Sequence, residues 1–119
     1  MKNIINLDIL KPEENIIILN GKKIDVSFIP CGIVFQIDDL VTKLNLITAE
    51  SIEKDISKAK EAYDLGIELC YTFCQHLYPE LDLEYFSKKI TVHQLRAVID
   101  AIKIALVNSY KGIEEGSKN

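Results

Sequence analysis

The sequence contains no tryptophan, only three prolines and five glycines, and no long uninterrupted run of apolar residues. A membrane-spanning helix needs about 20 predominantly apolar residues in succession, and no run in this chain approaches that length. The first residues, MKNIINLDILKPEE, place an acid and a proline where a signal peptide needs an unbroken apolar stretch. The sequence therefore predicts a cytoplasmic protein without a membrane partner.

The chain also lacks an excess of positive charge, because 14 Lys and Arg residues stand against 18 Asp and Glu residues, for a net charge of −4. Proteins that bind nucleic acid usually neutralise phosphates with clustered Lys and Arg side chains. The basic doublets are Lys22-Lys23 and Lys88-Lys89, and neither is flanked by a pair of aromatic residues that could stack on bases. We therefore expect no nucleic-acid partner.

Recognisable catalytic motifs are missing too: the chain has no phosphate-binding glycine loop, no GxSxG and no HExxH. Cys70 and Cys74 are spaced to share a helix face, and Cys31, His76 or His93 could complete a metal site with them. However, both cysteines fall in an apolar stripe, the chain has no CxxC pair, and an odd number of cysteines is typical of reduced cytosolic thiols. We predict core thiols, with no catalytic residue, cofactor or metal site.

The clearest structural signal is a β-hairpin near the beginning of the chain. Residues 15–19 (NIIIL) are rich in strand-forming side chains, and Asn20-Gly21 is the dipeptide that most favours a tight hairpin turn. Residues 23–28 then alternate polar and apolar side chains. This alternation predicts a strand with one buried and one solvated face, the buried face being formed by Ile24, Val26 and Phe28.

Helical periodicity dominates the rest of the chain. It predicts a helix from Ile33 to Leu46, a second from Thr48 or Ser51 to Tyr78, a short third over residues 83–88, and a fourth beginning after Thr91 and ending near Lys111. Thr91 and Gln94 form the pattern of a capping box, and Gly112 is placed to cap the end of the last helix.

The expected architecture is α+β, with an N-terminal antiparallel β-hairpin packed on a bundle of three to four α-helices. Residues 1–14 are interpreted as an N-terminal arm, residues 15–112 as a single domain and residues 113–119 as a flexible tail. A length of 119 residues suits one compact domain and is too short for two.

Three apolar residues lie outside the helical stripes that can face the core. At about 100° per residue, Ile104 and Val107 lie roughly opposite the main stripe of the last helix, and Phe35 lies off the stripe of the first. Either the domain encloses the last helix from two sides, or these residues form an exposed patch that another chain covers. Phe35, Ile104 and Val107 are our candidate protein-interaction residues.

The segments ILNGKKIDVSFIP and ITVHQLRAVIDAIKIALVNSY, with an amphipathic helix between them, resemble the tail assembly chaperones of siphophages and related prophages. The resemblance covers about residues 15 to 112 and rests on the order of elements, the size and the acidity. It implies a protein that is not an enzyme, acts in the bacterial host cell, self-associates, coats the tape measure protein, and hands it to tail-tube subunits.

Two other hypotheses remain open from the sequence. One is a minor structural or connector protein that stays in the phage particle, and the other is a thiol- or metal-dependent enzyme or regulator that uses the three cysteines.

Overall fold

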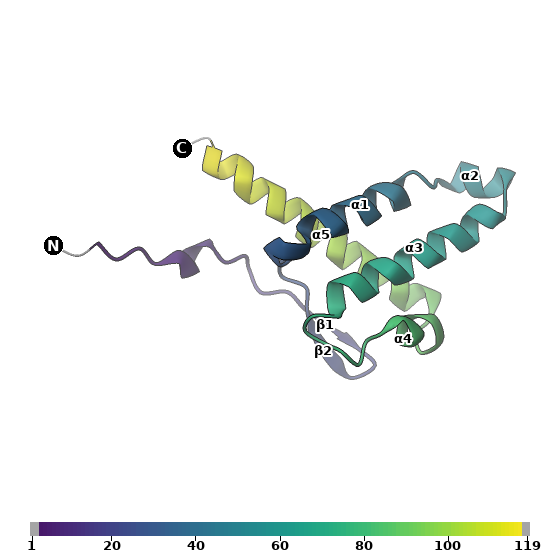
Figure 1. Ribbon diagram of the computed structural model, residues 1–119, viewed down its shortest axis with the longest axis horizontal. Coiled ribbons are helices and arrows are strands. Elements are labelled where there is room, and N and C mark those ends of the chain that lie inside the picture. Colours follow the sequence, from purple (N-terminus) through teal and green to yellow (C-terminus); the bar gives the residue numbers. More distant parts are fainter. Residues whose placement is uncertain (1–2, 118–119) are drawn as a thin grey trace.

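The computed structural model describes residues 3–117, and the side chains of residues 3–111. Within this part of the chain, an antiparallel hairpin packs against five helices, which confirms the predicted α+β class (Figure 1). None of the described helices is long and apolar enough to cross a lipid bilayer. The strands are β1 (Ile16–Leu19) and β2 (Lys22–Asp25), and the helices are α1 (Val34–Asn45), α2 (Ala49–Lys54), α3 (Ser57–Cys74), α4 (Leu83–Lys88) and α5 (Val92–Ser117).

The hairpin turn has the geometry that its sequence predicts. Asn20 and Gly21 both have positive φ, at 50° and 83°, and Leu19 pairs with Lys22 across the turn. Two consecutive residues with positive φ define the turn type whose twist matches that of two paired strands.

The side chain of Asn20 also fastens this turn to the helices. Its amide nitrogen donates to the Tyr85 hydroxyl and to the Lys89 carbonyl, each at 3.1 Å, and its oxygen accepts from Gln94 at 3.0 Å. Gln94 in turn completes the predicted capping box with Thr91 at the start of α5, where the two residues exchange hydrogen bonds of 2.9 and 3.1 Å. One asparagine therefore sets the turn and ties the hairpin to the junction of α4 and α5.

The prediction that Phe28 shares the buried face of the second strand is wrong. Ile24 is buried as expected, but β2 ends at Asp25, Ser27 is buried and Phe28 is about half exposed. The Asp25 carboxylate accepts a hydrogen bond from the Ser27 amide, and the Ser27 hydroxyl accepts one from the Asn15 amide at 2.7 Å. The local bond to Asp25 turns the backbone out of the strand, and the bond to Asn15 holds Ser27 inward, so the alternation of side chains stops there.

The single helix predicted from residue 48 or 51 to Tyr78 is in fact two helices, α2 and α3, and the second ends at Cys74. The break lies at Asp55, whose backbone is extended with φ −149° and ψ 104°. The Asp55 carboxylate accepts hydrogen bonds from the amide and the hydroxyl of Ser57, at 3.0 and 2.7 Å. Such a side chain competes with the helical backbone for its donors and starts a new helix.

The predicted end of the last helix is also wrong. α5 continues past Lys111 and Gly112 to Ser117, so Gly112 does not cap it. A glycine inside a helix costs only about 1 kcal/mol relative to alanine, and no proline follows to stop the helix. Residues 118–119 of the predicted tail lie outside the described residues.

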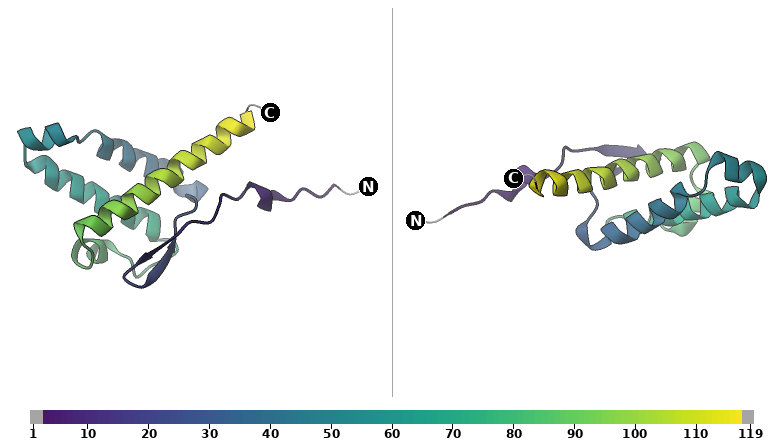
Figure 2. Two further views of the ribbon diagram at one scale, coloured as in Figure 1. Left: turned by 180° about the vertical axis from the view of Figure 1, so that it is seen from behind. Right: turned by 90° about the horizontal axis from the view of Figure 1, so that it is seen from above.

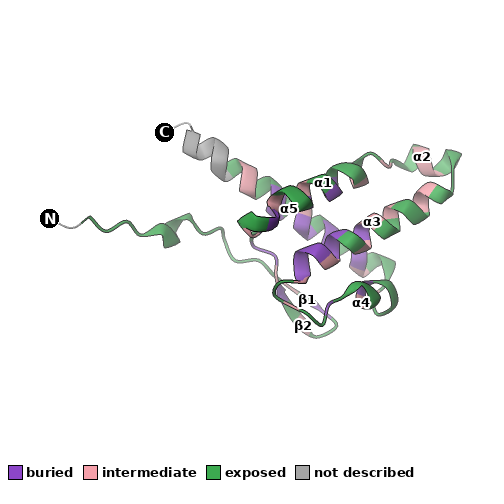
Figure 3. Ribbon diagram, in the orientation of Figure 1, coloured by how far each residue is buried: buried purple, intermediate pink, exposed green. Residues whose placement is uncertain are grey.

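The helices form two layers. α1 and α3 pack side by side, and α5 crosses both of them as the second layer (Figure 2). Buried residues occur on all three helices and on the hairpin, in the parts of the ribbon where these elements meet (Figure 3). The most completely buried include Ile24, Ile37, Leu69, Phe73 and Ile102. Residues 3–14 project from this body as an arm whose only regular structure is a short 3-10 turn, Leu7–Leu10.

Gly66, in the middle of α3, lies in close contact with α5. A Cβ atom added there would lie 2.7 Å from Cδ1 of Ile99 and 3.7 Å from Leu95, both on α5. The absence of a side chain at Gly66 therefore allows these two α5 residues to pack directly on the α3 backbone.

We predict that Gly66→Ala and Ile99→Val are energetically coupled. Gly66→Ala favours the helix by about 1 kcal/mol but displaces the Ile99 methyl, and Ile99→Val alone costs about 0.5–1.5 kcal/mol. Because the valine lacks the obstructing methyl, the double variant should be more stable than the sum of the single effects by at least about 0.5 kcal/mol. Denaturant unfolding of the unsubstituted chain, the two single variants and the double variant measures this coupling energy.

Gly32→Ala is the matched control, because no atom lies within 4 Å of the Cβ position at Gly32. It should show no coupling to Ile99→Val. Strict additivity of the Gly66 and Ile99 substitutions would contradict the close approach of α3 and α5.

Candidate functional site: an apolar groove between α3 and α5

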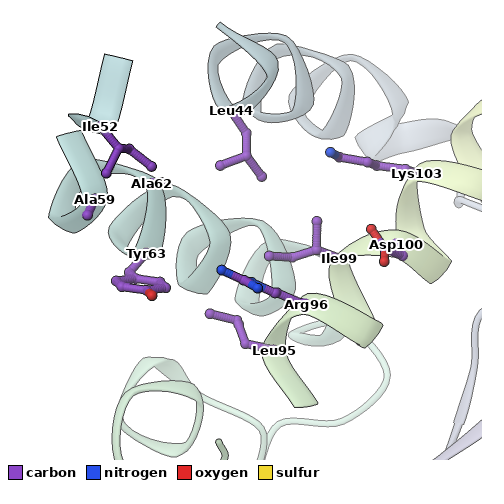
Figure 4. Close-up of a pocket in the computed structure, with 10 residues that line it drawn as sticks. All are labelled: Leu44, Ile52, Ala59, Ala62, Tyr63, Leu95, Arg96, Ile99, Asp100 and Lys103. Carbon is purple, nitrogen blue, oxygen red and sulfur yellow. The ribbon is translucent and has the colours of Figure 1, made fainter. Parts of the chain in front are cut away.

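A groove of about 240 Å³ lies where α1, α2, α3 and α5 meet (Figure 4). We call it the α3–α5 groove. It is lined by Leu44 from α1, Ile52 from α2, Ala59, Ala62 and Tyr63 from α3, and Leu95, Arg96, Ile99, Asp100 and Lys103 from α5.

The floor of the groove is apolar and its rim is polar. The floor combines leucine and isoleucine side chains from α1, α2 and α5 with the small side chains of Ala59 and Ala62, which leave room above α3. The rim carries Arg96, Asp100 and Lys103 along α5 and the Tyr63 ring across from them (Figure 4). A concave apolar surface bordered by charged groups is the usual composition of a site that receives another polypeptide.

Local sequence features explain how this groove arises. Gly66 brings Leu95 and Ile99 onto α3, which sets the height of the floor. The helix break at Asp55 separates α2 from α3, so that Ile52 can close one end of the groove instead of continuing along the same helix. The groove is therefore a consequence of one glycine contact and one helix interruption.

Two of the predicted interaction residues extend the groove along α5. Ile104 and Val107 are 56% and 51% exposed, so the described part of the chain does not enclose α5 on this side. Residues three or four apart on a helix are surface neighbours. Ile104 therefore lies next to Asp100, and Val107 lies next to Lys103, so the pair continues the rim of the groove in the direction of Tyr110.

The third predicted residue, Phe35, lies on α1 and is 81% exposed. It stands one helical turn from Asp38. Desolvation, with a smaller effect of the Asp38 carboxylate, raises the pKa of Tyr110 on α5. Val107 is likewise one turn from Tyr110. Phe35 and Val107 therefore each lie one helical turn from one of the two residues, Asp38 and Tyr110, through which α1 affects α5.

Other surfaces of the helices carry many ion pairs. Oppositely charged residues one turn apart form ion pairs along α1, α2, α3 and α4: Lys43–Asp39, Lys54–Glu50, Lys58–Glu61, Lys60–Asp64 and Lys88–Glu84. Such pairs keep a helix face solvated and contribute little to stability. The apolar groove is therefore set apart from the charged faces around it.

The cysteines do not converge on this groove. Cys70 and Cys74 are buried in the core and Cys31 is exposed, and within the described residues no group of three or more His, Cys, Asp or Glu side chains is placed to hold a metal ion. Burial raises the pKa of Cys70 above its ordinary range, and burial with a smaller effect of Glu80 raises the pKa of Cys74 to about 12. At neutral pH these thiols are protonated, which makes them poor nucleophiles.

The sequence patterns considered above predict neither the groove nor the exposed apolar character of the arm. The groove has one local signal, an isolated glycine within an apolar helical pattern at Gly66, which often marks a close approach of backbones. The arm has a plainer one: its apolar side chains are 65–91% exposed, namely Ile4, Ile5, Leu7, Ile9 and Leu10.

The buried thiols predict how stability depends on pH. An unfolded thiol has a pKa of about 8.5, so folded chains with raised thiol pKa values keep their full stability below pH 8.5 and lose it as the pH rises toward 12. At pH 9.5, the free energy of unfolding should be lower by about 1.4 kcal/mol for each buried thiol. Denaturant unfolding at pH 7 and pH 9.5 measures the loss, and Cys74→Ala should reduce it.

Cys31→Ala is the control for this experiment, because it removes an exposed thiol in place of a buried one. An identical loss of stability in Cys74→Ala and in the unsubstituted chain would show that the buried thiol does not contribute.

Comparison of the chain with protein-family models, with curated proteins and with solved structures gives no match. The geometry of the molecule is therefore the basis for inferring what it does.

Proposed function

We propose that this protein is a tail assembly chaperone that binds and solubilises the tape measure protein of a long-tailed phage. The observation that carries the proposal is the α3–α5 groove, with its apolar floor, charged rim and apolar extension along α5. The resemblance of the hairpin and helix sequences to that family supplies the identity of the client.

The shape of the groove suits a helical client. An amphipathic helix binds a groove by inserting apolar side chains that recur every three or four residues. Ala59, Ala62 and the adjoining leucine and isoleucine side chains offer them an apolar floor, and Arg96, Asp100 and Lys103 can pair with the charges that flank such a helix. Before a tail tube encloses it, a tape measure protein exposes long apolar helical stretches of this kind.

The size of the groove favours side chains over a metabolite. Its volume of about 240 Å³ is below the roughly 300–1,000 Å³ that is usual for small-molecule sites. Binding and release are all that a chaperone of this kind requires, so the proposal assigns no catalytic step to the protein. We further propose that release occurs when tail-tube subunits cover the same client surface.

We predict that Ala62→Arg weakens client binding by placing a charge on the apolar floor. Loss of a central contact in an interface typically costs about 2 kcal/mol, which corresponds to a roughly 30-fold weaker affinity. The measurement is the soluble fraction of the tape measure protein of the same genome after co-expression with each variant. It should fall toward the level found without the chaperone.

Ala97→Arg is the matched control, because Ala97 is an exposed alanine on α5 that does not line the groove. It introduces the same charge in the same type of helix and should leave solubilisation unchanged. Equal solubilisation by both variants would refute the groove as the client site.

We also predict that the apolar extension along α5 contributes to client binding. Ile104→Asp together with Val107→Asp should lower the affinity by about tenfold, since the client loses two partly covered apolar contacts. Because both side chains are about half buried, unchanged far-UV circular dichroism should accompany the measurement to show that the variant is folded. Phe35→Asp tests the exposed aromatic residue of α1 in the same way. Unchanged affinity in all these variants would confine the client site to the groove.

A further inference from the structure

We propose that, in the absence of client, the arm of residues 3–14 from one copy of this chain occupies the α3–α5 groove of a second copy. This inference rests on the groove being the peptide-binding site proposed above. It adds an occupant and a means of regulation: the protein shields its own apolar site until a client displaces the arm.

The first observation is the chemistry of the arm. Its apolar side chains are among the most exposed in the described structure, with Ile4 at 91%, Ile9 at 79% and Ile5 at 78%. Exposed apolar groups that lie close together mark a surface that another element covers. Leu7 and Leu10, at 65% and 74%, continue the same surface through the short 3-10 turn.

The second observation is the direction of the arm. Its base is held to the hairpin: the Asn15 carbonyl accepts a hydrogen bond from the Val26 amide at 2.9 Å, and the Asn15 amide donates to the Ser27 hydroxyl. From this anchor the arm runs away from the body, at the opposite end of the molecule from α2, which closes the groove (Figure 1). An arm that points away from its own groove is available to the groove of another copy.

The third observation is charge. The arm carries Asp8, Glu13 and Glu14 against a single base, Lys11. The groove rim carries the bases Arg96 and Lys103 against a single acid, Asp100. The arm is apolar and acidic, whereas the groove has an apolar floor and a basic rim. Opposite charge therefore favours contact of an arm with a groove over contact of two arms or of two grooves.

The fourth observation is size. The arm offers twelve residues and the groove ten, whereas a stable interface uses about 20–30 residues from each partner. One arm in one groove is therefore a small contact, weak enough for a longer client helix to displace. A reversible cover of this kind protects the apolar floor without blocking the site.

The test is disulfide trapping between two full-length chains that both carry Cys31→Ser, which removes the exposed native thiol. One chain carries Ile9→Cys in the arm and the other carries Ala62→Cys in the groove. After mixing and mild oxidation, we expect a cross-linked heterodimer in at least tenfold higher yield than with Ala97→Cys, the exposed α5 position outside the groove. Equal yields at the two positions would overturn the inference.

A single chain that carries both Ile9→Cys and Ala62→Cys distinguishes a second copy from the chain's own arm. Cross-linked species of dimer mass and above support exchange between copies. A quantitative cross-link at monomer mass, at micromolar protein concentration, would show that the arm occupies the groove of its own chain. That result would overturn the proposed exchange between copies.

A variant with Ile5→Asp, Leu7→Asp and Ile9→Asp tests the regulatory consequence, and unchanged far-UV circular dichroism shows that it is folded. Its sedimentation should no longer depend on concentration, and it should bind the co-expressed tape measure protein at least as well as the unsubstituted chain, because no arm competes for the groove. Leu46→Asp, which removes an exposed leucine just after α1 and outside the groove, should change neither property.

The two proposals can fail separately. Trapping at Ala62→Cys without any effect of Ala62→Arg on the tape measure protein would support the arm contact and refute the client site. Loss of solubilisation in Ala62→Arg without trapping would support the client site and refute the arm contact.

Discussion

The close contact between α3 and α5 at Gly66 is the constraint on which the site depends. Because Gly66 has no side chain, Ile99 and Leu95 pack directly against the α3 backbone. Their outer surfaces then become the floor of the groove, and the next positions along α5, Arg96, Asp100 and Lys103, become its rim. A larger residue at Gly66 would displace the end of the Ile99 side chain and so change the floor of the groove. Packing in the core and shape at the surface are thus set by the same contact.

How much of the fold the sequence predicts depends on the range of the interactions. The Asn20-Gly21 turn and the Thr91–Gln94 capping box were predicted correctly, since each is decided by residues within a few positions of one another. The break at Asp55 has a local cause as well, its hydrogen bonds to Ser57, but a continuous apolar stripe concealed it. In that case a side chain competing for backbone donors prevailed over helical periodicity.

The groove could not be predicted in the same way. It brings residues of α1 and α2 beside residues of α5 that are about fifty positions away along the chain, as in the case of Leu44 and Ile99. Helical periodicity shows that Ile104 and Val107 lie off the core stripe, and the structure shows both to be exposed. Periodicity does not show which neighbouring helix lies beside them. Which helices are neighbours depends on how they cross, and Gly66 is the only local feature of the sequence that indicates this crossing.

The β-hairpin and the arm of residues 3–14 could each join copies of this protein, but they differ in how much apolar surface they expose. The hairpin offers strands of only four residues, and one edge is partly covered where the Asp25 amide donates to the Tyr78 hydroxyl at 3.0 Å. Ile18 is the one largely exposed apolar side chain on these strands. The arm exposes five such side chains, although its second half lies beside Ser27 and Phe28. Because the free energy of association grows with the apolar area removed from water, the arm has the larger driving force for self-association, and the hairpin serves mainly to anchor its base.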